Sequence, residues 1–261
     1  MKCMNSRDAN PFSLSGKKIL VTGASSGIGK AIAKAISTVG GDVVLIARTR
    51  GKLESVLAEL EGDSHRISAI DLLSRECELE SSLNLLLDEV GPIDGLVHSA
   101  GSFGFSALRS FSYGEADRFF HLNHNVFLVL SKILAKRKSE KKEARSFIAI
   151  ASAAGLKGNP GLTLYSASKA ALISTVRCLA LEYAQRNIRF NCICPGWVDT
   201  PMLEVAKEML GDTIFRENIV NSHPLGLGTP EDVANAAVFL LSKASRWITG
   251  SSLVIDGGYS I

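Results

Sequence analysis

The chain has 261 residues, of which 46% are hydrophobic and 21% charged, which is enough apolar sequence for the core of one large α/β domain. Its net charge of +3 is too small to predict binding to nucleic acid or to a membrane surface. The first residues lack the apolar core of a signal peptide, and no run of about 18 apolar residues predicts a membrane span. We expect residues 1–12 to form a flexible arm before a single domain at 13–261.

Strand-like and helix-like segments alternate along the whole chain. The short apolar segments that predict strands are residues 17–21, 42–48, 65–72, 93–101, 145–155, 188–196 and 250–258. The segments of helical period are residues 30–40, 52–62, 76–91, 114–137, 163–186 and 230–242. This repetition predicts a single-domain α/β fold of Rossmann type, with a doubly wound parallel sheet and helices on both faces. Ligands of such sheets bind beyond the carboxyl ends of the strands, so the residues just after each strand are the site candidates.

The segment TGASSGIG, residues 22–29, joins the first predicted strand to the first predicted helix. Glycine lets the backbone turn sharply and lets an anion approach closely, and a helix start offers unpaired N–H groups to a phosphate. This pattern predicts a site for the phosphates of a dinucleotide. The alternative is an ordinary turn between a strand and a helix.

The end of the second predicted strand indicates which dinucleotide binds. An acidic residue there would bind a ribose hydroxyl and favour NAD, but this chain has Ala47 followed by Arg48, with Arg50 close by. A guanidinium suits a phosphate in charge and geometry, so we predict NADP(H), with Arg48 on its 2′-phosphate and Arg50 as a helper. Alternatively, both arginines are solvated loop residues. Asp71, at the end of the third strand, either accepts a hydrogen bond from adenine or caps the next helix.

The segment YSASK separates Tyr165 and Lys169 by one helical turn on the same helix face. A nearby ammonium stabilises a phenolate and is expected to lower the tyrosine pKa, so that the phenol exchanges a proton near neutral pH. Ser152 ends a predicted strand, where its hydroxyl would hold a substrate oxygen. Taken singly, the spacing also arises by chance, and Ser152 also fits an ordinary turn.

The cysteines and histidines do not predict a metal site. Five cysteines without a C-x-x-C pair predict free thiols and a cytoplasmic protein. We expect Cys192 and Cys194 to pack in a buried strand, because no histidine pair with ligand spacing accompanies them. His121 and His124 lack a third ligand at a suitable spacing, and His98 is expected to be a hydrogen-bonded core residue.

In their order and spacing, the motifs resemble the short-chain dehydrogenase/reductase family from about residue 14 to 258. The resemblance is carried by TGASSGIG, by SAG at 99–101, by Asn123 and Ser152, by YSASK, by PG at 195–196 and by the closing GSSLVIDGG. In one departure, Ser99 stands where the family commonly has an asparagine that supports the centre of the sheet. The basic residue sometimes found before the second motif glycine is also missing, since Ser26 is there, so NADP preference depends mainly on Arg48.

The resemblance implies roles for individual residues. It makes Tyr165 the general acid/base, Lys169 the residue that binds the nicotinamide ribose, and Ser152 the residue that polarises the substrate oxygen. Asn123 would kink its helix and hold a water of a proton relay. The predicted cofactor-binding residues are Gly23, Ser25, Ser26, Gly27, Ile28, Gly29, Arg48, Asp71, Leu72, Ser99, Ala100, Gly101, Tyr165, Lys169, Pro195, Gly196, Val198 and Thr200.

The resemblance also suggests a substrate class. NPGLTLYSASKAAL and PGWVDTPM look most like the 3-oxoacyl-(acyl carrier protein) reductase branch, which implies NADPH-dependent reduction of a ketone, with a 3-oxoacyl thioester as one option. The alternatives are an alcohol, sugar or steroid dehydrogenase that works oxidatively with NAD or NADP, and a non-catalytic NADPH-binding regulatory protein. An acidic carrier protein would meet the basic residues Arg137, Lys138, Lys141, Lys142, Arg145 and Arg186.

Two further expectations concern the substrate side and the assembly. Residues 200–225 fall where the family has a mobile substrate lid, and Met202, Leu203, Met209, Leu210 and Phe215 either face an apolar substrate or pack as ordinary helix residues. Trp197 either lines the substrate cleft or packs under the next loop. The resemblance suggests that the long helices starting near Gly114 and Thr163 pair across a two-fold axis in a homotetramer or homodimer, although they are alternatively internal core helices.

Overall fold

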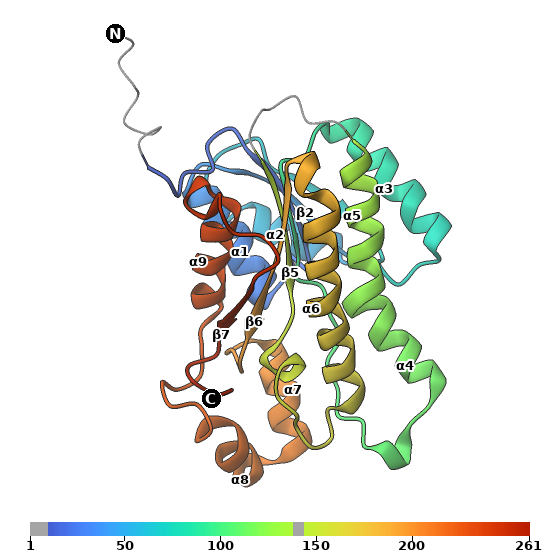
Figure 1. The fold of residues 1–261 in the computed structure, drawn as a ribbon, viewed down its shortest axis with the longest axis vertical. Coiled ribbons are helices and arrows are strands. Elements are labelled where there is room, and N and C mark those ends of the chain that lie inside the picture. Colours follow the sequence, from blue (N-terminus) through green and yellow to red (C-terminus); the bar gives the residue numbers. More distant parts are fainter. Residues whose placement is uncertain (1–9, 138–143) are drawn as a thin grey trace.

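The computed structural model of the chain describes residues 10–137 and 144–261, and its centre is a parallel β-sheet (Figure 1). The strands run in the order β3-β2-β1-β4-β5-β6-β7, and every neighbouring pair is parallel. Their bounds are Lys18–Thr22 (β1), Asp42–Ala47 (β2), Arg66–Ala69 (β3), Gly95–His98 (β4), Arg145–Ile150 (β5), Ile188–Pro195 (β6) and Ser252–Ile255 (β7). Because the strand order reverses between β1 and β4, a crevice opens at the carboxyl edge between them. The predicted fold class is confirmed.

Helices cover both faces of the sheet, and Figure 1 shows α1 and α9 on one side and α3, α5 and α6 on the other. The first layer contains α1 (Gly27–Thr38), α2 (Arg50–Leu57) and α9 (Pro230–Leu241). The second contains α3 (Glu76–Val90), α4 (Tyr113–Phe120), α5 (Val126–Lys136) and α6 (Thr163–Tyr183). Two further helices, α7 (Pro201–Leu210) and α8 (Asp212–Phe215), follow β6 at the carboxyl end of the strands. Among the described residues, no helix is long and apolar enough to cross a membrane.

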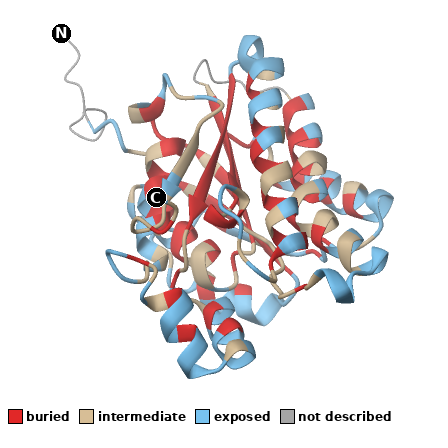
Figure 2. Ribbon diagram, turned by 60° about the horizontal axis from the view of Figure 1, so that its bottom comes forward, coloured by how far each residue is buried: buried red, intermediate tan, exposed pale blue. Residues whose placement is uncertain are grey.

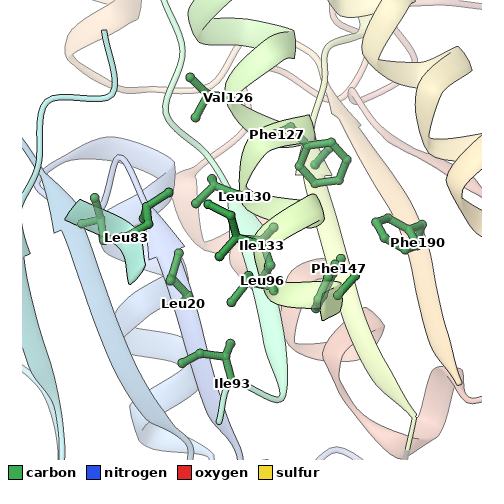
Figure 3. Packing of buried hydrophobic residues seen from close by; sticks show 14 of the residues in the cluster. Leu20, Leu83, Ile93, Leu96, Val126, Phe127, Leu130, Ile133, Phe147 and Phe190 are labelled. Atoms are coloured by element: carbon green, nitrogen blue, oxygen red, sulfur yellow. The ribbon is translucent and has the colours of Figure 1, made fainter. Parts of the chain in front are cut away.

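The core consists of two apolar layers, one on each side of the sheet (Figure 2). Successive side chains of a strand point to opposite faces, so Leu20 packs under α3 and α5 while Ile19 packs under α1 and α9. In the layer under α3, α5 and α6, the ring of Phe190 meets those of Phe127 and Phe147 edge to face, with centroids 6.3 and 5.2 Å apart (Figure 3). Each fully buried ring contributes roughly 1.5–3 kcal/mol of hydrophobic stabilisation.

Predictions for individual buried side chains are confirmed. Cys192 and Cys194 are fully buried in β6, and all four described cysteines are free thiols. His98 is 1% exposed, and its ring nitrogens hydrogen-bond to Thr22 Oγ1 and to the Leu122 carbonyl oxygen. Burial lowers the pKa of His98 to about 3, so this ring is neutral at physiological pH.

The predicted basic surface needs one correction. Arg145 begins β5 and is buried, and its guanidinium donates to the carbonyl oxygens of Leu134 and Arg137, at 2.7 and 3.2 Å. The prediction that Arg145 meets a carrier protein is therefore wrong, because this side chain joins the end of α5 to the sheet. Arg186 remains exposed. The other predicted residues of this segment, Lys138, Lys141 and Lys142, lie outside the described residues, as does most of the predicted arm.

Candidate active site

A cavity of about 590 Å³ lies at the carboxyl ends of the strands. Its wall is formed by the segments that follow β1 to β6, together with α7 and the C-terminal Tyr259. Apart from Arg50, it includes every residue that the sequence analysis assigned to the cofactor, and it includes Ser152. The predicted catalytic residue Asn123 is fully buried and lies behind this wall rather than in it.

The glycine turn at residues 23–29 is a close backbone crossing. Gly23 and Gly27 have positive φ angles of +67° and +50°. A Cβ added to Gly23 would lie 2.7 Å from the Ala100 backbone nitrogen, and one added to Gly29 would overlap the Gly23 carbonyl oxygen. The turn leads into the start of α1, where backbone N–H groups and the helix dipole attract an anion. The residues therefore fit a nucleotide pyrophosphate.

Two basic side chains border the cavity after β2. Arg48 and Lys52 both line it and both are exposed. Arg50, the predicted helper, instead directs its guanidinium to the Glu54 carboxylate, 3.0 Å away. The sequence analysis missed Lys52, although its position in the first turn of α2, four residues after Arg48, was a usable signal.

Asp71 and Leu72 line the cavity after β3. The Asp71 carboxylate accepts a hydrogen bond from the Leu73 backbone N–H at 3.0 Å and so closes a local turn. The alternative that Asp71 caps the next helix is wrong, because α3 starts at Glu76 and its N-cap residue is Arg75.

Ser152, Tyr165 and Lys169 come together in the middle of the cavity. Ser152 follows β5, and its hydroxyl hydrogen-bonds to the phenol of Tyr165 and accepts the Ala154 N–H at 3.1 Å. Tyr165 and Lys169 occupy successive turns of α6, where they are 8% and 5% exposed. The Lys169 ammonium donates to the Ile150 carbonyl oxygen at 2.8 Å and lies 5.8 Å from the centre of the Tyr165 ring.

The pKa of Tyr165 departs from the expected direction. Burial raises the pKa of the phenol, and the hydrogen bond from Ser152 offsets only part of that rise. Lys169 does not lower the pKa of Tyr165 as expected, because its ammonium is directed to the backbone of Ile150. Burial lowers the pKa of Lys169 to about 8, so the amine keeps most of its charge at neutral pH and loses it on mild alkalinisation.

Asn123 lies in the irregular turn His121–Asn125 that interrupts the long predicted helix between α4 and α5. Its amide is fully buried and joins two elements of the site. The oxygen accepts the Ser102 N–H at 2.8 Å, while the nitrogen donates to the Ser102 carbonyl at 3.1 Å and to Ser168 Oγ at 3.0 Å. A Cβ on Gly101 would lie 3.0 Å from the Asn123 oxygen and 3.5 Å from Lys169 Nζ. The amide thus braces the loop after β4 close to the lysine.

Aromatic rings form the other end of the cavity. Phe103 meets Tyr165 and Trp197 edge to face, with centroids 5.3 Å apart in both pairs. Tyr259 lines the same end, and its phenol hydrogen-bonds to Asn159 and to the Trp197 side chain. Trp197 is therefore a cleft residue. The sequence analysis missed Phe103, Asn159 and Tyr259, since no local pattern connects these distant segments.

The segment predicted to be a lid divides between two roles. Met202 and Leu203 of α7 line the cavity. Leu203, Leu210 and Phe215 also pack together in a small core with Ile219, so these apolar residues are partly ordinary helix packing. Met209 is exposed.

The described residues contain no group of three or more histidine, cysteine or acidic side chains that could hold a metal ion. Both histidines considered at the sequence level have other partners. His121 Nε2 hydrogen-bonds to the Leu72 carbonyl oxygen, and His124 hydrogen-bonds to Asn125 and Thr175.

The parallel sheet, the glycine turn and the Ser152–Tyr165–Lys169 group define a dinucleotide-binding oxidoreductase of Rossmann type. A family model described as enoyl-(acyl carrier protein) reductase matches residues 23–260. The chain belongs to the short-chain dehydrogenase/reductase family, and within that family it resembles the 3-oxoacyl-(acyl carrier protein) reductases.

Two curated relatives show the extent of the likeness. Oxidoreductase UcpA of Salmonella typhimurium is 34% identical over 256 residues, covering 95% of this chain and 96% of the relative. The 3-oxoacyl-(acyl carrier protein) reductase FabG of Rickettsia prowazekii is 35% identical over 246 residues, covering 94% and 97%.

Solved structures agree on the fold but differ in their nucleotide. A 3-ketoacyl-(acyl carrier protein) reductase from Brucella melitensis, in complex with NADH, has a TM-score of 0.84 at 31% identity and covers 95% of this chain and all of its own. A 7α-hydroxysteroid dehydrogenase in complex with NADH and 7-oxo glycochenodeoxycholic acid has a TM-score of 0.85 at 31% identity, covering 98% and 97%. A structure from Agrobacterium tumefaciens with bound NADP has a TM-score of 0.80 at 30% identity, covering 96% and 98%. A nicotinamide cofactor is therefore supported for this chain.

Proposed function

We propose that the protein is an NADPH-dependent reductase that converts a ketone to a secondary alcohol, with 3-oxoacyl thioesters as the first substrates to test. The observation that carries this proposal is the buried phenol of Tyr165, which hydrogen-bonds to Ser152 beside the buried Lys169, in a cavity whose other end has a glycine turn. The likeness to proteins named 3-oxoacyl-(acyl carrier protein) reductase supports the substrate class.

In this mechanism a nicotinamide held in the cavity would supply the hydride for the carbonyl carbon. Tyr165 donates its phenolic proton to the substrate oxygen, while the Ser152 hydroxyl holds that oxygen in line. The raised pKa of Tyr165 favours this direction, because a phenol that remains protonated at neutral pH is a proton donor. Lys169 holds the nicotinamide ribose and carries the charge that assists return of the proton. Asn123 orients the loop after β4 and supports a water-mediated relay past Lys169.

The cofactor-binding residues divide by the part of the dinucleotide they meet. Gly23, Gly27 and Gly29 accommodate the pyrophosphate, because their turn allows backbone contact at the start of α1. Arg48, with Lys52 beside it, binds the 2′-phosphate that distinguishes NADP from NAD. The adenine meets Asp71, Leu72 and the turn at 99–101, and the nicotinamide meets Pro195, Gly196, Val198 and Thr200.

The direct test compares wild type with Tyr165→Phe on a panel of ketones and β-ketothioesters, with oxidation of NADPH and of NADH as the measurement. We expect the wild type to reduce members of the panel with NADPH, and Tyr165→Phe to lower kcat by about 10²–10⁴-fold with little change in the Kd of NADPH. Equal rates in the two proteins would contradict the catalytic role and favour the regulatory alternative. Activity confined to alcohol oxidation would favour the dehydrogenase alternative.

A more specific part of the substrate proposal is that the 3-oxoacyl group is linked to a carrier protein. Arg186 is exposed, whereas Arg137 is paired with Asp88 at 2.8 Å. Arg186→Glu should therefore raise KM for a carrier-linked 3-oxoacyl substrate and leave a small thioester unaffected. An equal response of both substrates would show that Arg186 has no docking role.

The homotetramer or homodimer is likewise a proposal. Leu128, Val129, Leu179 and Tyr183 line a second, shallower hollow between α5 and α6, and another copy of the chain would cover it. Sedimentation measures this state directly. The cytoplasmic location remains a prediction.

A further inference from the structure

His223 lies near the end of the lid segment at residues 200–225; it is buried at 4% exposure and is not among the predicted site residues. Its Nε2 accepts the backbone N–H of Trp197 at 3.1 Å, and its Nδ1 lies 2.7 Å from the Ile219 carbonyl oxygen. A backbone N–H only donates and a carbonyl oxygen only accepts, so Nδ1 carries the proton and Nε2 carries the lone pair. The two contacts thus fix one neutral tautomer and tie the lid to the loop after β6.

The imidazole lies directly behind the Gly196–Trp197 backbone. A Cβ on Gly196 would be only 2.9 Å from His223 Nε2, so the ring leaves this backbone no room to retreat. Trp197 in turn meets Phe103 edge to face, and Phe103 meets Tyr165 in the same way. A displacement of the Trp197 backbone would therefore reach both the proposed nicotinamide contact and the wall beside the phenol.

The other face of this arrangement is the C-terminal segment. The His223 ring stacks on Tyr259 with centroids 4.6 Å apart and planes 5° apart. Lys157 lies 4.3 Å from the centre of the Tyr259 ring and donates to the Tyr259 carbonyl oxygen at 2.7 Å. The lid, the loop after β6 and the C-terminal segment thus meet at one side chain.

We propose that His223 is a positioning residue for hydride transfer. It holds the Gly196–Trp197 backbone at the height that the nicotinamide requires, and it couples that backbone to the end of the lid. The inference rests on the proposed reductase function. It predicts that loss of the Nε2 acceptor lowers kcat and weakens cofactor binding beyond what loss of stability explains, because a small misplacement of reacting groups is costly.

The chain contains a matched control in His65. This ring is also buried, at 5% exposure, and it also accepts a backbone N–H, from Val43 at 3.1 Å, and lies 2.8 Å from the carbonyl oxygen four residues earlier, that of Glu61. It lies beside the start of β2, at the edge of the sheet opposite to the cavity. A substitution at His65 therefore removes the same kind of contacts without touching the site.

The experiment compares His223→Leu, His223→Gln and His65→Leu, all in a Trp247→Phe background. Trp247 is 90% exposed and does not line the cavity, and its replacement leaves Trp197 as the only tryptophan. The measurements are the melting temperature, kcat and KM for a ketone that the background protein reduces, the Kd of NADPH from its own fluorescence, and the emission of Trp197. The last two do not depend on turnover.

We expect both leucine variants to lose stability, but only His223→Leu to lower kcat, by about 10- to 100-fold, to raise the Kd of NADPH and to shift the Trp197 emission. The amide oxygen of His223→Gln can accept the Trp197 N–H, so this variant should recover most of kcat and the wild-type emission. Should His223→Leu fail to fold, a soluble His223→Gln with wild-type emission and kcat still supports the inference.

Equal kcat, Kd and emission in His223→Leu and His65→Leu would overturn the inference, and so would a His223→Gln that is stable but as impaired as His223→Leu. Failure of the proposed function is seen separately, as a Trp247→Phe background protein that binds NADPH but reduces no ketone.

Discussion

The nucleotide end and the substrate end of the cavity are built in different ways. The nucleotide end is made of short local segments, each directly after a strand, and much of it is backbone: the glycine turn at 23–29, the turn at 99–101 and the loop at 195–200. The substrate end is made of side chains from segments far apart in the chain: Phe103 packs against Tyr165 and Trp197, and Tyr259 hydrogen-bonds to Asn159.

Because of this difference, a substitution at one end can change the binding of one ligand without changing the binding of the other. A backbone cradle recognises groups common to all dinucleotides, and Arg48 adds the discrimination between NADP and NAD at its rim. An aromatic wall recognises shape, and its members can be exchanged one by one without moving the sheet. We therefore expect substitutions at the nucleotide end to change Kd for the cofactor and substitutions at the substrate end to change KM for the ketone.

The largest effect among these substitutions should come from Arg48→Ala. Loss of a charge-assisted contact of about 1.5–3 kcal/mol predicts a roughly 10- to 150-fold increase in the Kd of NADPH, with the Kd of NADH unchanged. Fluorescence titration of both cofactors measures this. Arg50→Ala is the matched control, because its guanidinium pairs with Glu54, and it should leave both constants unaltered. An unchanged preference in Arg48→Ala would remove the basis for assigning NADPH.

The same division, between local segments and side chains brought together from far apart, explains which features could be predicted from the sequence. The alternation of apolar strands with helical segments predicted the order of elements and the parallel sheet, because each element's pattern is local. The glycine turn at 23–29 was predictable too, because the type and spacing of Gly23 and Gly29 indicate a close backbone approach. The pairing of Arg50 with Glu54, four residues later on the same helix, is also a local pattern, but the sequence analysis missed it.

The substrate end was largely out of reach of the sequence. Tyr259 and Asn159 are separated by 100 residues and meet only because β7 returns the chain to the cavity. Arg145 likewise looked like part of a basic surface until the sheet buried it against the end of α5. The pKa of Tyr165 was misjudged for the same reason, since burial is a property of the whole fold.

Lys169 lies where the two ends join, and its pKa of about 8 predicts opposite pH effects on activity and stability. Above pH 8 the amine loses its proton, so kcat for reduction should fall by about tenfold per pH unit where this charge is required. The free energy of unfolding should rise from pH 8 to 10.5 relative to Lys169→Met, because the unfolded chain, with its ordinary lysine pKa, then binds a proton that the folded chain lacks.

Parallel measurements of kcat and of denaturant unfolding between pH 7 and pH 10.5 test this pair of signs. For Lys169→Met, kcat should be lower than that of the wild type at pH 7 and should stay constant as the pH rises. A parallel fall of wild-type activity and stability would indicate alkaline unfolding and would remove the assignment of the fall in kcat to Lys169.

The smallest effect should come from Tyr259→Phe, which keeps the ring stacked on His223 but removes the hydroxyl that bonds to Asn159 and Trp197. A net hydrogen bond is worth about 0.5–1.5 kcal/mol, so KM for a ketone that reaches this end should change by roughly 2- to 12-fold. The Kd of NADPH should stay constant, and Tyr113→Phe, at a side chain 81% exposed, is the control. A change in cofactor Kd as large as that in KM would show that the phenol also supports the loop at 195–200, and the two ends could then no longer be treated as separable.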